Sequence, residues 1–239
     1  MIRRATVDPA GATIYETRVD RTSRADLGVW LRRLDGGPAR RILEPLPADG
    51  RFGRTFSTEF TWAADGQRLA VQSCGEVACR TRVVARDGSL VGELQAPDLG
   101  VLVGFAGDRA VTYGACRGWP CPIVSVDVRT GTRLTLEASG GQAVVAPTSE
   151  GARLVLETQR ATGRVLRSMS LDGASASDLG PIPEGLGLGF GAGHSAAATR
   201  LPEGWILLAP DTSPDGRAVR QQLRRIPDGM AVPFDEVMR

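Results

Sequence analysis

A turn followed by a short apolar strand recurs five times along the 239-residue chain. Each copy has a small or acidic residue and a glycine before the strand, and then a looser loop, a second strand and another tight turn. In the middle of the chain the copies begin about 42 residues apart, a spacing typical of repeat architectures. The five segments, DPAGATIYETRV, AADGQRLAVQSC, FAGDRAVTYGAC, TSEGARLVLETQ and LPEGWILLAPD, begin at Asp8, Ala63, Phe105, Thr148 and Leu201.

Within these units apolar and polar residues alternate with a period of two, as in RTRVVARDG and PIVSVDVRTG. No segment carries an apolar helical stripe over three turns, so we expect almost no helix. Four short strands in a unit of about 40 to 45 residues are typical of a β-propeller blade. Because one four-stranded sheet cannot bury both of its faces alone, such blades stack around an axis.

We therefore predict an all-β fold in which residues 1–239 form a single β-propeller domain of four-stranded blades, with five blades. The expected blades span about 3–47, 55–97, 100–139, 142–180 and 186–236. A fragment of a six- or seven-bladed propeller is the alternative, because only RRATV is available as the innermost strand of the first blade. A β-sandwich fits five similar units less well.

The segment FSTEFTWAADGQRLAVQS, together with VVARDGSL, resembles the blade pattern of the TolB-type, WD40-like bacterial β-propeller repeat family. In that family an aromatic residue and an Asp-Gly turn precede a Leu-Ala-Val strand. The resemblance covers all five units and is strongest over residues 56–95. It implies a bacterial propeller, but propellers serve as enzymes, ligand binders and scaffolds, so it says little about function.

The four cysteines form two pairs with equal spacing, Cys74 with Cys79 and Cys116 with Cys121. In a propeller blade each pair would face across the mouth of the hairpin between the second and third strands, close enough for a disulfide bond. Free thiols and a zinc site remain alternatives, although structural zinc prefers CxxC pairs or histidine ligands and the chain has one histidine. We predict two disulfides and no metal or other cofactor.

Disulfides persist in oxidising compartments, so we expect an extracytoplasmic protein that is secreted, periplasmic or anchored at the cell surface. The N-terminus has a basic start without the apolar region of a signal peptide. Export would therefore require a segment upstream of Met1. A net charge of +2, with 29 scattered arginines and no lysine, does not indicate nucleic-acid binding, and no apolar run is long enough for direct membrane insertion.

Propeller geometry separates a face of tight acidic turns from a face of longer loops. The acidic residues of the first face, such as Asp8, Asp65 and Asp172, are explained by turn formation. The loop-rich face carries arginines, and Trp119 stands at the tip of the hairpin of Cys116 and Cys121. A rigid aromatic residue is suited to anchor a partner, although Trp119 could also fold back on a neighbouring loop. The predicted partner-binding residues are Arg117, Trp119, Arg51, Arg160 and Arg217, and Arg18, Arg21, Arg24, Arg54 and Arg164 should lie on the same face.

Catalytic patterns are weak. The single histidine, His194, adjoins Ser195 and cannot readily act as its base, and the glycines of GLGLGFGAG lack the lysine of a phosphate-binding loop. The expected innermost strands are apolar, and Trp30, Trp62 and Trp205 are expected in the core between blades. We assign no catalytic residue.

The sequence thus favours an exported, non-catalytic propeller that binds a protein, peptide or glycan partner through its loop-rich face. A propeller hydrolase or lyase with a site in the central channel is one alternative. The other is an accessory propeller domain of a larger envelope protein. The sequence leaves open the identity of the partner and the oligomeric state.

Overall fold

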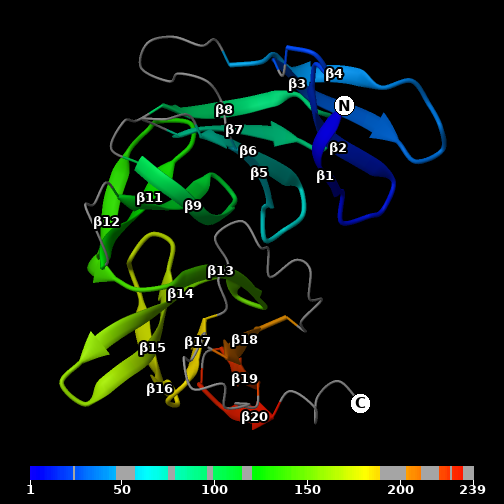
Figure 1. The fold of residues 1–239 in the computed structure, drawn as a ribbon. Coiled ribbons are helices and arrows are strands. Elements are labelled where there is room, and N and C mark those ends of the chain that lie inside the picture. Colours follow the sequence, from blue (N-terminus) through cyan, green and yellow to red (C-terminus); the bar gives the residue numbers. More distant parts are fainter. Residues whose placement is uncertain are drawn as a thin grey trace.

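The computed structural model describes residues 1–23, 25–46, 57–74, 79–95, 99–114, 120–188, 203–210, 221–226 and 228–233. Within these ranges the regular structure is entirely β, as five four-stranded antiparallel sheets in which each strand pairs with its neighbours in sequence. The sheets follow one another along an arc, from the N-terminal sheet to the C-terminal one (Figure 1). The part of the chain that is described contains no helix that could cross a membrane.

The first three sheets lie between Ile2 and Gly140. The first contains β1 (Ile2–Val7), β2 (Thr13–Val19), β3 (Asp26–Arg33) and β4 (Arg40–Leu43). The second contains β5 (Ser57–Trp62), β6 (Arg68–Cys74), β7 (Cys79–Ala85) and β8 (Leu90–Gln95). The third contains β9 (Leu99–Ala106), β10 (Arg109–Gly114), β11 (Cys121–Asp127) and β12 (Arg133–Gly140).

Two further sheets follow. The fourth contains β13 (Ala143–Thr148), β14 (Gly151–Arg160), β15 (Gly163–Ser170) and β16 (Ala176–Pro181). The fifth contains β17 (Leu186–Leu188), β18 (Trp205–Pro210), β19 (Gln222–Arg225) and β20 (Ala231–Pro233). Five four-stranded sheets confirm the predicted fold class, an all-β propeller with five blades.

The hydrophobic core consists of four clusters, each between two sheets that are adjacent in sequence. Between the second and third sheets, for example, Val83 and Leu94 pack with Phe105 and Val126. The alternation of apolar residues along each strand supplies both faces of the inner sheets. Among the described residues, no such cluster joins the first sheet to the fifth.

The prediction for Trp30 is wrong, and that for Trp62 is confirmed. Trp62 packs with Tyr15 between the first two sheets, with ring centroids 5.2 Å apart. Trp30 is paired in register with Glu16 and lies on the opposite face of the first sheet, where the Arg18 guanidinium stands 4.4 Å from its ring centroid. Alternation along a strand decides this, because Val29 and Leu31 already face the second sheet.

Trp205 is also predicted in the core between blades, and alternation along its strand again places it elsewhere. Its strand neighbours Ile206 and Leu208 pack against the fourth sheet, so the Trp205 side chain projects from the other face of the fifth sheet. Instead of joining the cluster between these two sheets, its ring lies 6.0 Å from the guanidinium carbon of Arg225.

Acidic residues shape the tight turns, as predicted. Asp65, Asp87 and Asp172 each accept a hydrogen bond from the backbone amide two residues ahead, at 2.9 to 3.0 Å. In Asp228, hydrogen bonds from the Arg225 side chain and then from the Met230 amide lower the pKa to about 2. The pKa of Asp87 is likewise lowered, first by the Ser89 hydroxyl and then by the Ser89 amide.

These turns predict a loss of stability in acid. A carboxylate whose folded pKa is depressed stabilises the fold above its unfolded pKa of about 3.9, and this contribution is lost as the pH falls through the folded pKa. We expect the urea midpoint of unfolding to be level between about pH 7 and pH 5 and to fall between about pH 4 and pH 2. The Asp228→Asn variant should fall less steeply; a midpoint that is level down to pH 2 would contradict the role of the turns.

Candidate functional site

A disulfide bond closes one hairpin of the loop-rich face. Cys74 ends β6 and Cys79 begins β7, and the two are directly paired across the strands and linked by a disulfide with their Cα atoms 4.1 Å apart. This confirms the predicted bond. Cys121, the first residue of β11, is also disulfide-bonded and buried. Its expected partner Cys116 lies outside the described residues.

Most of the predicted binding residues also lie outside the part of the chain that the structure describes. They are Arg51, Arg117, Trp119 and Arg217, and the same holds for Arg24, Arg54 and His194. Arg160 is described, and it stands exposed at the end of β14. Of the five predicted partner-binding residues, Arg160 is the one that lies within the described residues.

Arg160 lines a cavity of about 420 Å³ between the third and fourth sheets. The third sheet contributes Glu137 and Ser139 from the end of β12, and Pro120 precedes β11. The fourth sheet contributes Arg160 and its strand neighbours, together with Arg164 of β15. Alternate connections of an antiparallel sheet open at the same end, so this cavity lies on the loop-rich face.

Glu157 and Arg164 form the inner wall of the cavity and are bound to the fifth sheet. The Glu157 carboxylate is 6% exposed and accepts hydrogen bonds from the Leu188 amide at 2.6 Å and from Arg164 Nη1 at 3.3 Å. Arg164 also donates to the Leu186 carbonyl oxygen at 2.5 Å. The charges of these two side chains are thus compensated within the protein.

The second glutamate of the wall is paired as well. Glu137 Oε2 accepts a hydrogen bond from Arg167 Nη1 at 3.3 Å, and both side chains are partly exposed. This contact crosses from β12 to β15 and links the third and fourth sheets. Neither Glu137 nor Glu157 was identified from the sequence, although an acidic residue inside the apolar strand RLVLETQR is a signal for a buried polar role.

Arg160 differs from its neighbours. The backbone oxygen of Arg160 accepts a hydrogen bond from Gln159 Nε2 at 3.2 Å, whereas its guanidinium group makes no hydrogen bond or ion pair within the described chain. The side chain is exposed at the rim of the cavity. Among the described residues, the cavity wall therefore has one cation without a partner, Arg160, and two carboxylates that are paired with arginines.

Tyr113 of β10 lies beneath the same end of the two sheets. Its hydroxyl donates to the backbone oxygen of Gly141, a residue of the cavity wall, at 3.4 Å. Burial raises the pKa of Tyr113 to about 12. The hydroxyl is thus protonated at neutral pH and acts as a donor that supports the wall.

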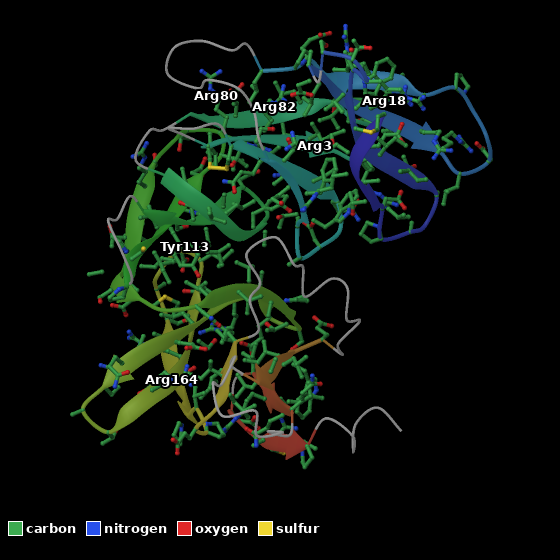
Figure 2. All side chains as sticks on the ribbon, viewed as in Figure 1. Arg3, Arg18, Arg80, Arg82, Tyr113 and Arg164 are labelled. Carbon is green, nitrogen blue, oxygen red and sulfur yellow. A yellow bond between two sulfur atoms is a disulfide. The ribbon has the colours of Figure 1, made fainter. Side chains whose placement is uncertain are left out.

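Other arginines expected on this face have different surroundings. Arg18 lies in β2, donates to Glu16 Oε1 through Nε at 2.8 Å, and covers Trp30. Figure 2 shows Arg18 on the first sheet, far along the arc from Arg164. Arg21 is exposed in the loop between β2 and β3. The described arginines expected on this face thus lie on separate blades, and of these Arg160 and Arg164 line the cavity.

Within the described residues, no three histidine, cysteine, aspartate or glutamate side chains are gathered in a group that could hold a metal ion. The cavity wall is instead a set of hydrogen-bonding groups and paired charges. Such a wall can hold a polar ligand by position and charge.

No protein-family model matches the chain, and no curated protein matches its sequence. Solved structures are similar in fold. TolB from Acinetobacter baumannii has 15% sequence identity and a TM-score of 0.53, with 94% of this chain and 53% of TolB covered. This chain thus spans about half the length of that protein.

Two further structures are proteins with enzyme names. The β-propeller domain of the Trilobed protease from Pyrococcus furiosus is 12% identical with a TM-score of 0.62, over 98% of this chain and 70% of that one. The oligogalacturonate lyase from Vibrio parahaemolyticus is 12% identical with a TM-score of 0.61, over 96% of this chain and 64% of that one. The chain therefore has the fold of TolB-like β-propellers, a fold that also occurs in proteins with different activities.

Proposed function

We propose that this chain is an exported, non-catalytic β-propeller that binds a protein, peptide or glycan partner through its loop-rich face. The observation that carries the proposal is the cavity between the third and fourth sheets, where the guanidinium group of Arg160 has no partner within the described chain while Arg164 is paired. An exposed arginine next to a cavity is suited to bind an anionic or hydrogen-bonding group of a partner.

The disulfide bonds support an extracytoplasmic location. Cys74 and Cys79 are joined, and Cys121 is disulfide-bonded, which is typical of proteins that mature outside the cytoplasm. A disulfide across a hairpin also restrains the loop that it closes, so a partner would meet a surface that loses little conformational entropy on binding. Arg51, Arg117, Trp119 and Arg217 belong to the proposed binding surface as predictions from the sequence.

The test is capture of a partner from the extracytoplasmic fraction of the source cells by the immobilised protein. We expect the triple variant Arg117→Ala, Trp119→Ala and Arg160→Ala to lose at least about ten-fold in captured partner, with an unchanged melting temperature. The control is Arg129→Ala, which removes an exposed arginine at the tight turn between β11 and β12. Equal capture by the triple variant and the wild type would overturn the proposal.

A lyase or hydrolase is the second candidate, favoured by the fold likeness to the oligogalacturonate lyase. This candidate predicts turnover of an oligogalacturonate by the purified protein, detected by the absorbance of the unsaturated product. Turnover that survives the triple variant would favour the enzyme over the binding function.

A further inference from the structure

We infer that the cavity between the third and fourth sheets binds one carboxylate group of a peptide ligand, with Arg160 as the cation that recognises it. The inference rests on the proposed function and gives the chemistry of the group that the loop-rich face would recognise.

The charges favour a ligand with a single negative charge. Glu157 is neutralised by Arg164, and Glu137 is neutralised by Arg167. Arg160 is left as the one cation of the cavity wall without a partner in the described chain. One carboxylate would compensate it. A dianion such as phosphate would add a second negative charge close to the carboxylates of the two glutamates, where repulsion is only partly screened.

Two side chains of the wall, Arg160 and Ser139, carry N–H or O–H donors that no group of the described chain accepts. The Arg160 guanidinium offers the planar fork of N–H groups that matches the two oxygens of a carboxylate. Ser139 is exposed on the facing sheet, and its hydroxyl makes no hydrogen bond within the described residues. The site thus offers a charged fork from β14 and a hydroxyl from β12, on opposite sides of the cavity.

The wall also offers an acceptor for a peptide N–H. Gln159 lines the cavity, and its side-chain carbonyl oxygen can accept an N–H of a peptide bond. A volume of about 420 Å³ lies toward the lower end for ligand pockets and suits one or two residues.

The experiment measures binding of a minimal peptide carboxylate, N-acetylglycylglycine, by calorimetry and by saturation-transfer NMR of the ligand. We expect a Kd on the order of 1 mM, because so small a ligand makes few contacts. The C-terminal amide of the same compound, which lacks the charge, should bind at least about ten-fold more weakly. Glucuronate and inorganic phosphate serve as the sugar-acid and dianion probes.

Two matched variants locate the site. Arg160→Gln should weaken binding of N-acetylglycylglycine at least about ten-fold, and Ser139→Ala should weaken it by about two- to five-fold. Arg21→Gln removes the same charge from an exposed loop of the first sheet and should leave the Kd unchanged. Equal melting temperatures of the three variants would establish that the fold is intact.

The inference is overturned if Arg160→Gln binds the peptide carboxylate as well as the wild type, if no binding is found, or if the amide binds equally well. Tighter binding of glucuronate or phosphate than of the peptide would overturn the ligand class. These outcomes are separate from the partner capture described above. Carboxylate binding that depends on Arg160, combined with capture that is unaffected in the triple variant, would retain the site and reject the proposed function.

Discussion

Replacing Phe105 by alanine is expected to lower the free energy of unfolding by about 3 to 5 kcal/mol, the range for truncating a fully buried phenylalanine. The side chain is 1% exposed and packs with Val83 and Leu94 of the second sheet. Because each sheet buries its faces only against its neighbours, the cavity would weaken the contact between the second and third sheets. Urea unfolding followed by tryptophan fluorescence measures the change.

Leu90→Ala is the control for this substitution. Leu90 lies in β8 of the second sheet, the sheet against which Phe105 packs, but its side chain is 55% exposed. Its truncation should therefore change the free energy of unfolding by less than about 0.5 kcal/mol. A loss below about 1 kcal/mol for Phe105→Ala would mean that the two sheets do not pack as described.

The second large effect is expected for Glu157→Ala. The carboxylate joins β14 to β17 through the Leu188 amide and holds Arg164 at the cavity wall. Its removal leaves the buried Leu188 N–H without its acceptor, whereas the 34% exposed side chain of Arg164 keeps the Leu186 carbonyl oxygen as an acceptor. Leaving a buried donor such as the Leu188 N–H unsatisfied costs about 1 to 3 kcal/mol. Thermal or urea unfolding of the variant measures it.

Glu137→Ala provides the matched control, since it makes the same substitution in the same cavity wall. The side chains of Glu137 and Arg167 are 22% and 28% exposed, and water can solvate what the substitution leaves unpaired. We expect a loss of at most about 1 kcal/mol. Glu157→Gln, which keeps an acceptor for the Leu188 amide, should lie between the two. Equal losses for the two alanine variants would show that Glu157 does not connect the fourth and fifth sheets.

The elements that depend on local sequence could be predicted. A strand ending at Cys74, a hairpin and a strand beginning at Cys79 follow from alternation and spacing, and the disulfide follows from the hairpin. The turns at Asp65 and Asp172 follow from the ability of an aspartate to bind the amide two residues ahead. These features need only a few consecutive residues.

The face of the sheet on which each tryptophan lies could not be predicted from local sequence. Trp30 and Trp62 both lie in apolar strands, yet only Trp62 faces a neighbouring sheet. A shift of one residue moves a side chain to the other face of a strand, so the assignment depends on register. It also depends on which faces of the terminal sheets have a neighbour, which the repeat does not specify.

By itself, the sequence determined the five four-stranded units, their turns and the hairpin disulfide, because each arises from interactions between residues close along the chain. Only the tertiary structure decided which charges are available at the candidate site. Arg160, Arg164 and Arg167 are equivalent as sequence, but Arg167 meets Glu137 from another sheet and Arg164 meets Glu157 across a hairpin. Arg160 makes neither contact, since the stacking and register of the sheets place it at the rim of the cavity.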